Sequence, residues 1–220
     1  MGIISVEKVD NLIWLGRYSE RVYITIKEFF SGYDKMLENP QFYINYCQNM
    51  QIPCIYQDSK DFIQHYIKDE KDINSIIANL YRGYDNCIVL RNEISSECVS
   101  YLELALNDLK HINDYHSFII DLQFVLDHIL AFWASLEENV QDYEVRSMIK
   151  LGKRIECLDM YLRLRRSKQE IKKAYAMLEN RLHKNYLPYD LKQLTQLKQC
   201  IEQEEISYEA AINCVESLIE

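Results

Sequence analysis

The sequence predicts an all-α protein, folded as a single antiparallel bundle of about seven to nine helices. The 220 residues include only five Gly and three Pro, whereas sandwiches and barrels need frequent turn signals. Hydrophobic residues make up 48% of the chain, and they recur at three- and four-residue steps over long segments. One domain over residues 1–220 is expected, with a less regular insert at about 35–71.

The first helix is predicted to begin after the N-cap Ser5 and to run to Phe30, where the segment SGYD at 31–34 ends it. Two prolines interrupt the pattern that follows. Between and after them, residues 39–50 and 59–70 are typical of short helices, and KDEKD at 68–72 is typical of a solvated linker.

The next two helices are separated by a short connection. The first is predicted from the N-cap Asp72 to about Asn92, and the second from Ser95 or Ser96 to Ile112. A connection this short makes them antiparallel neighbours or a single kinked rod.

The second half of the chain predicts one apolar helix followed by four amphipathic ones. The segment NDYH at 113–116 breaks the pattern before residues 117–140, whose apolar content on nearly every side predicts the most central helix. Asp190, with Gln193 three residues later, predicts a capping box. The remaining helices are predicted at 142 to about 166, 168–184, 191–203 and 207–220.

One segment of the first helix, LIWLGRYSERVY at 12–23, has a counterpart in MIKLGKRIECLDMYLR at 148–163. The alignment pairs Leu15 with Leu151, Gly16 with Gly152, Arg17 with Lys153 and Glu20 with Glu156. A glycine at the same position of each helix allows close approach, which would bring the two Glu residues near each other. Within the first helix, Arg17 lies three residues before Glu20, where the two side chains can pair.

Three hypotheses follow for these charged residues. Glu20 and Glu156 could act as an acid and base pair if burial and mutual repulsion raise one pKa. They could instead form a buried ionic lock, neutralised by the neighbouring cations. The Arg residues could also face a cleft and bind a carboxylate or phosphate. The candidate binding residues are Arg17, Glu20, Arg21, Lys153, Arg154 and Glu156.

No metal and no cofactor is predicted. The sequence has no Glu-x-x-His pair, and its nearest match is Asp108 with His111. It also has no phosphate loop and no G-x-G-x-x-G motif. Among the histidines, His128 is of interest because it lies in the apolar central helix beside Asp127.

Positive charge is concentrated in residues 146–184, which contain twelve Lys or Arg and four acidic residues in a chain of net charge −9. A solvated helical face is the favoured interpretation; a nucleotide or an acidic partner is the alternative. The overall acidity and the lack of a recognised motif argue against nucleic acid. A basic stretch in an acidic chain leaves self-association open.

A reducing, cytoplasmic location without a membrane segment is expected. The seven Cys are odd in number and include no CxxC pair. The N-terminus has no basic region followed by an apolar run, and no segment reaches about 18 uninterrupted apolar residues.

The chain resembles the alpha-E family of bacterial proteins, which is named for an all-helical prediction and an ER motif. Four segments carry the resemblance: IWLGRYSERVY with Glu20 and Arg21 at the ER positions, NSIIANLYRGYDNCIVLRNEISSE at 74–97, LGKRIECLD, and DMYLRLRR. In the third segment Glu156 retains the acid, but Cys157 replaces the Arg.

The resemblance implies a part in a peptide-ligation or protein-modification system, because such proteins are encoded beside circularly permuted ATP-grasp and transglutaminase-like proteins. The first functional hypothesis is a non-catalytic partner that docks an ATP-grasp-type ligase or its peptide substrate through Arg17, Glu20, Arg21 and the basic stretch. The second is a hydrolase or transferase that uses Glu20 and Glu156. The third is a nucleotide or polyanion binder through residues 146–184.

Overall fold

The computed structural model describes residues 5–112 and 118–219, and within these ranges it contains ten helices and no strand. The all-α bundle is therefore confirmed, with one helix more than the expected range. The helices are α1 (Val6–Glu38), α2 (Phe42–Met50), α3 (Ser59–Lys68), α4 (Ile76–Val89), α5 (Ser96–His111), α6 (Phe118–Asn139), α7 (Tyr143–Arg163), α8 (Lys168–His183), α9 (Leu191–Glu202) and α10 (Tyr208–Glu216).

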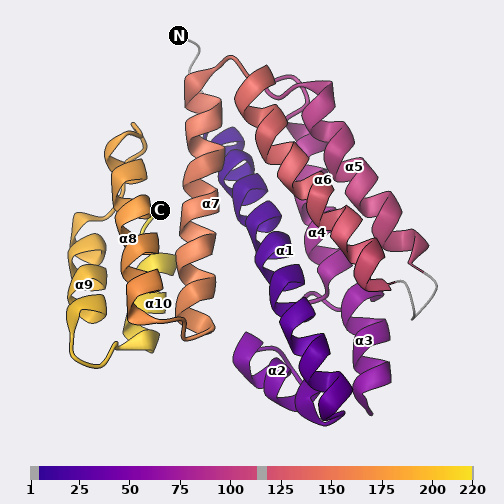
Figure 1. Cartoon of the computed structure of the whole chain (residues 1–220). Coiled ribbons are helices and arrows are strands. Elements are labelled where there is room, and N and C mark those ends of the chain that lie inside the picture. The colour runs from indigo at the N-terminus through magenta and orange to yellow at the C-terminus, as the bar shows by residue number, and fades with distance from the viewer. Residues whose placement is uncertain (1–4, 113–117, 220) are drawn as a thin grey trace.

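Two long helices, α1 and α7, lie side by side at the centre of the molecule (Figure 1). On one side of this pair, α4, α5 and α6 complete a bundle around α1. On the other side, α8 and α10 pack against α7, and α9 packs on α8 and α10. The short helices α2 and α3 lie at the end of the bundle where α1 ends.

The central pair is parallel, although mostly antiparallel neighbours were expected. Residue numbers increase in the same direction along both helices, as three contacts show: Ile13 with Gly152, Arg17 with Glu156, and Glu28 with Arg166. The hairpins α4–α5 and α5–α6 are antiparallel as expected. In the latter, Asp108 contacts His128 and Glu97 contacts Asn139. The intervening helices return the chain to the level where α1 began, so α7 runs in the same direction.

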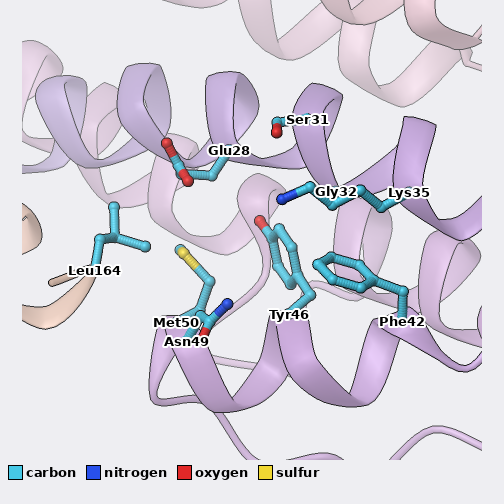
Figure 2. A pocket seen from close by; sticks show the side chains of 9 residues that line it. All are labelled: Glu28, Ser31, Gly32, Lys35, Phe42, Tyr46, Asn49, Met50 and Leu164. Carbon is cyan, nitrogen blue, oxygen red and sulfur yellow. The ribbon is translucent and has the colours of Figure 1, made fainter. Parts of the chain in front are cut away.

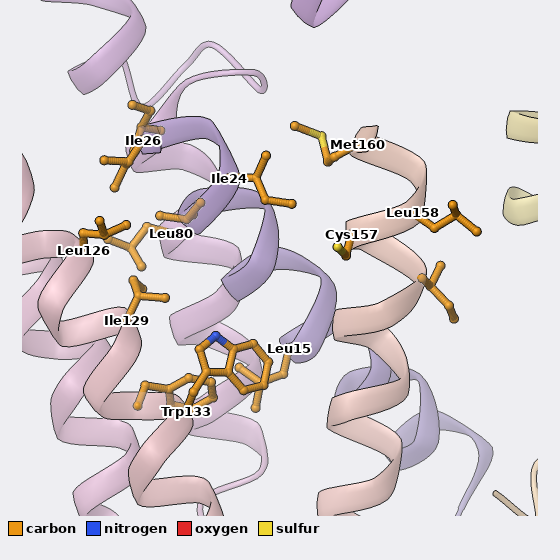
Figure 3. Close-up of a cluster of buried hydrophobic side chains, with 14 of the residues drawn as sticks. Leu15, Ile24, Ile26, Leu80, Leu126, Ile129, Trp133, Cys157, Leu158 and Met160 are labelled. Carbon is orange, nitrogen blue, oxygen red and sulfur yellow. The ribbon is translucent and has the colours of Figure 1, made fainter. Parts of the chain in front are cut away.

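Side chains from α1, α4, α6 and α7 fill the centre of the bundle (Figure 3). In α1, Leu12, Leu15 and Ile26 have no exposed surface. This burial on several sides follows from the position of α1 between α7 and α4. At the lower end of Figure 1, Phe29 of α1 stacks with Phe62 and Tyr66 of α3, which anchors the short helices.

The first helix continues to Glu38, so the prediction that residues 31–34 end it was wrong. A single Gly is tolerated within a helix, and at Gly32 the lack of a side chain lets α2 pack directly against the backbone of α1. A Cβ atom at this position would lie 2.6 Å from the ring of Tyr46. Figure 2 shows this contact at the edge of a small pocket between α1 and α2, which Lys35 and Phe42 also line.

Most predicted N-caps are confirmed, with one exception. The predicted caps Ser5, Ser95 and Asp190 each accept a backbone hydrogen bond, and Asp142 caps α7 in the same way. Helix α4 begins after Ser75, whose hydroxyl accepts from the Ala78 N–H at 3.1 Å. The predicted cap, Asp72, instead accepts from the Asn74 N–H in the preceding turn. A reciprocal capping box occurs at Ser167 and Glu170.

Helix α6 was expected to be the most central, but α1 and α7 hold that place. Its outer side exposes Ile120, Phe124 and Leu130. By length and composition alone, α6 is long and apolar enough to cross a membrane. In the bundle, 39% of an apolar 18-residue segment of this helix is buried. The predicted break at 113–116 lies outside the described residues.

Candidate functional site

The backbones of α1 and α7 touch at two glycines, as their shared sequence position predicted. A Cβ atom on Gly16 would lie 1.9 Å from the carbonyl oxygen of Ile149, and one on Gly152 would lie 2.0 Å from that of Ile13. The two helices therefore contact each other through equivalent positions, Ile13 and Gly16 of α1 and Ile149 and Gly152 of α7. The pair has an approximate two-fold axis along its length, and this contact fixes which side chains meet beside it.

Glu156 is held between two arginines of the opposite helix. Its side chain has no exposed surface. Arg17 Nε donates a hydrogen bond of 2.8 Å to Oε2, and Arg21 Nε donates to Oε1. Charge-assisted bonds to both oxygens compensate for the burial of the carboxylate.

Glu20 pairs across the same contact, with Lys153 of α7. The Lys153 ammonium lies 3.4 Å from Glu20 Oε2, and Glu20 is 5% exposed. The predicted pair of Arg17 with Glu20 was wrong, because the close approach of the helices presents Glu156 to Arg17 instead. Each Glu is neutralised by a cation from the other helix, which matches the approximate symmetry.

The two halves of this arrangement are unequal because Cys157 occupies the position equivalent to Arg21. Glu156 has two guanidinium partners, whereas Glu20 has one ammonium partner. Burial raises the pKa of Glu20, and the nearby Lys153 only partly opposes this. Burial, followed by the charge of Glu20, raises the pKa of the Cys157 thiol to about 11. The thiol is therefore neutral at physiological pH.

The ion pairs continue along α7 to a third helix. The fully buried Asp159 accepts a bond of 2.9 Å from Arg163 Nε and lies 4.0 Å from Arg21 Nη2. Arg163 also donates to Glu216 of α10 at 2.5 Å. No role is evident for Asp159 and Arg163 from the sequence alone, although their spacing from Glu156 places all three on one side of α7.

A second feature, the basic pocket, opens between α6, α7 and α8. Its lining residues are Trp133, Ala134, Glu137, Lys150, Lys153, Arg154 and Arg181. Lys153 belongs both to this pocket and to the central ion pairs. Arg154, which was predicted together with the central residues, lines the pocket instead. Part of the basic stretch at 146–184 thus converges on one hollow.

His128 contacts an acidic residue of the neighbouring helix. His128 Nε2 lies 3.0 Å from Asp108 Oδ2, which joins α6 to α5. The contact therefore pairs His128 with an acid of the neighbouring helix rather than with Asp127. Within residues 5–112 and 118–219, no group of three or more His, Cys, Asp or Glu is arranged to hold a metal ion.

The raised pKa of Glu20 predicts a pH-dependent loss of stability. A carboxyl group whose pKa is higher in the folded state binds its proton more tightly there, so the folded protein loses stability as pH rises above the ordinary value of 4.5. The Glu20→Gln variant should lack this loss. We expect its stability relative to the wild type to increase from pH 4.5 upward, measured by urea unfolding at a series of pH values. A constant difference across the series would contradict the prediction.

Comparison with known proteins places these residues in a family context. A family model described as Alpha-E, a predicted alpha-helical domain with a conserved ER motif, matches residues 8–217. The matched region includes Glu20 and Arg21, which form an ER dipeptide. No curated protein and no solved structure matches the chain.

Proposed function

The chain belongs to the Alpha-E family, and from that premise we propose that it is a non-catalytic helical partner in a peptide-ligation or protein-modification system. The observation that carries the proposal is the position of the ER-motif side chains. Arg21 binds the buried Glu156, and Glu20 pairs with Lys153. These groups hold α1 against α7, so the motif acts in the architecture of the bundle.

The same geometry supports the enzyme alternative less well. An acid and base pair made of Glu20 and Glu156 requires both carboxylates to reach a substrate. Glu156 has no exposed surface, and both of its oxygens accept from arginines. The alternative would therefore rest on Glu20 alone.

We assign the partner as an ATP-grasp-type ligase, following the association that membership of the family implies. The transglutaminase-like protein is the other associated candidate. The surface that suits a partner is the outer side of α6, where Ile120, Phe124 and Leu130 are exposed. It adjoins the strongly basic α7–α8 region, which complements an acidic protein surface. Exposed apolar groups beside such charge are typical of protein interfaces.

The test is association of the purified protein with the ATP-grasp-type protein encoded beside its gene, measured by mass photometry without nucleotide, with ADP and with ATP. We expect a complex whose affinity falls about tenfold or more in Phe124→Glu, since a buried aromatic side chain dominates many interfaces. Leu191→Glu is the matched control. Leu191 is also exposed but lies on α9, across the molecule from α6.

Two results would contradict the proposal. One is the absence of a complex under all three nucleotide conditions. The other is an equal loss of affinity in Phe124→Glu and Leu191→Glu, which would show that α6 is not the docking surface.

A further inference from the structure

Two arginines in the basic pocket make no ion pair within the described residues. Lys150 forms an ion pair with Glu137, and Lys153 forms one with Glu20. By contrast, Arg154 of α7 and the neighbouring Arg181 of α8 have no ion-pair or hydrogen-bond partner within the described part of the chain. Their planar groups retain all of their donors for a ligand.

The cations of the pocket repel one another. Burial lowers the pKa of Lys150, and the charges of Arg181, Arg154 and Lys153 lower it further. Burial also lowers the pKa of Arg181, with a further contribution from Arg154. Half-buried cations this close to one another destabilise the pocket, and a bound anion would remove that cost.

Trp133 of α6 forms part of the wall of the same pocket. Trp133 is 9% exposed, and its indole N–H has no acceptor within the described residues. The ring extends from α6 toward Leu15 (Figure 3), and the Lys153 ammonium lies 4.0 Å from its centroid. The indole therefore lies against a cation of the pocket, where its fluorescence can report on a bound ligand.

We propose that the basic pocket binds a phosphoryl group with several negative charges, such as a diphosphate or triphosphate chain. Arg154 and Arg181 supply two planar donor groups of the kind that bind phosphate oxygens in pairs. Lys150 and Lys153, on the same helix as Arg154, add positive charge to the pocket. The Lys153 ammonium already covers the face of Trp133, so the indole is not free to stack on a base. Recognition therefore centres on the phosphates.

The experiment uses Trp133 as its own reporter. The chain has two Trp residues, so Trp14→Phe leaves only the indole in the pocket. Sodium tripolyphosphate is titrated into this variant at low salt while its fluorescence is recorded. We expect a saturable change. Adding Arg154→Gln and Arg181→Gln should weaken the affinity about tenfold or more, because two charge-assisted contacts are lost.

The matched control is the pair Lys172→Gln and Lys173→Gln, in the same Trp14→Phe background. These lysines lie on the exposed side of α8, so the net charge falls equally but the pocket is intact. Its affinity should change by about twofold or less, the contribution of general charge. Circular dichroism and thermal unfolding verify that every variant is folded.

Three outcomes would overturn the proposal: no saturable change up to about 10 mM tripolyphosphate, equal weakening in the two double variants, or tighter binding of citrate than of tripolyphosphate. A parallel titration with ATP distinguishes the two sources of the phosphoryl chain. Tighter binding of ATP supports a nucleotide, and equal or tighter binding of tripolyphosphate supports a free polyphosphate.

Discussion

The Gly16→Ala substitution is expected to lower the free energy of unfolding by about 3 kcal/mol. This net loss already includes a gain of roughly 1 kcal/mol in helix propensity. The new Cβ would lie 1.9 Å from the carbonyl oxygen of Ile149, which is backbone and cannot rotate away. The helices must separate, and their flanking ion pairs would lengthen. Gly152→Ala should have a similar effect, because its Cβ would meet the Ile13 carbonyl at 2.0 Å. Urea unfolding followed by circular dichroism measures both.

Gly83→Ala is the matched control for this experiment. Gly83 is also buried in a helix, but a Cβ there would lie 3.5 Å from the Cβ of Tyr18, an ordinary contact. Only the gain in helix propensity remains, so this variant should be as stable as the wild type or slightly more stable. Equal stability of Gly16→Ala and Gly83→Ala would show that α1 and α7 do not touch as described.

Replacing Glu156 by glutamine is expected to cost about 3–5 kcal/mol, a large part of the stability of a typical domain. The change removes the negative charge that Arg17 and Arg21 share, and the side chains of these arginines are 14% and 32% exposed. Within the described residues, Arg17 would then have no acidic partner, and Arg21 would keep only Asp159 at 4.0 Å. Chemical unfolding at neutral pH measures the loss.

Glu205→Gln is the control for the same chemical change at an exposed position, and its effect should lie within about 0.5 kcal/mol. A double-mutant cycle with Arg21→Gln isolates the pair, and we expect a coupling energy between Arg21 and Glu156 of about 1–3 kcal/mol. If Glu156→Gln were as mild as Glu205→Gln, Glu156 would not be the central ion-pair partner. The ER motif would then need another role.

The contact between α1 and α7 could be anticipated because both helices carry the same short pattern. A repeated Gly with a nearby Glu specifies a close approach wherever two such helices meet. The partners of the charges could not be anticipated in this way. Spacing within one helix favoured Arg17 with Glu20, but the guanidinium reaches a carboxylate that is distant in sequence. Local spacing contains no information about which helix will be adjacent.

The basic pocket could not be predicted from the sequence, for a related reason. Charge composition identified the stretch at 146–184, but Trp133 comes from α6 and the relative rotation of three helices brings it beside Arg181. Hydropathy also overstated the burial of α6. An apolar helix can be central or can present part of its surface to a partner, and composition alone does not distinguish the two.

The parallel arrangement of the central helices has a consequence for folding order. The hairpins α4–α5 and α5–α6 join helices that are neighbours in sequence, so they close with little loss of chain entropy. The contact of Gly16 with Ile149 joins distant parts of the chain, so we expect it to form after the hairpins. Until then Glu156 lacks its arginines. We therefore expect the docking of α1 on α7 to be the rate-limiting step of folding.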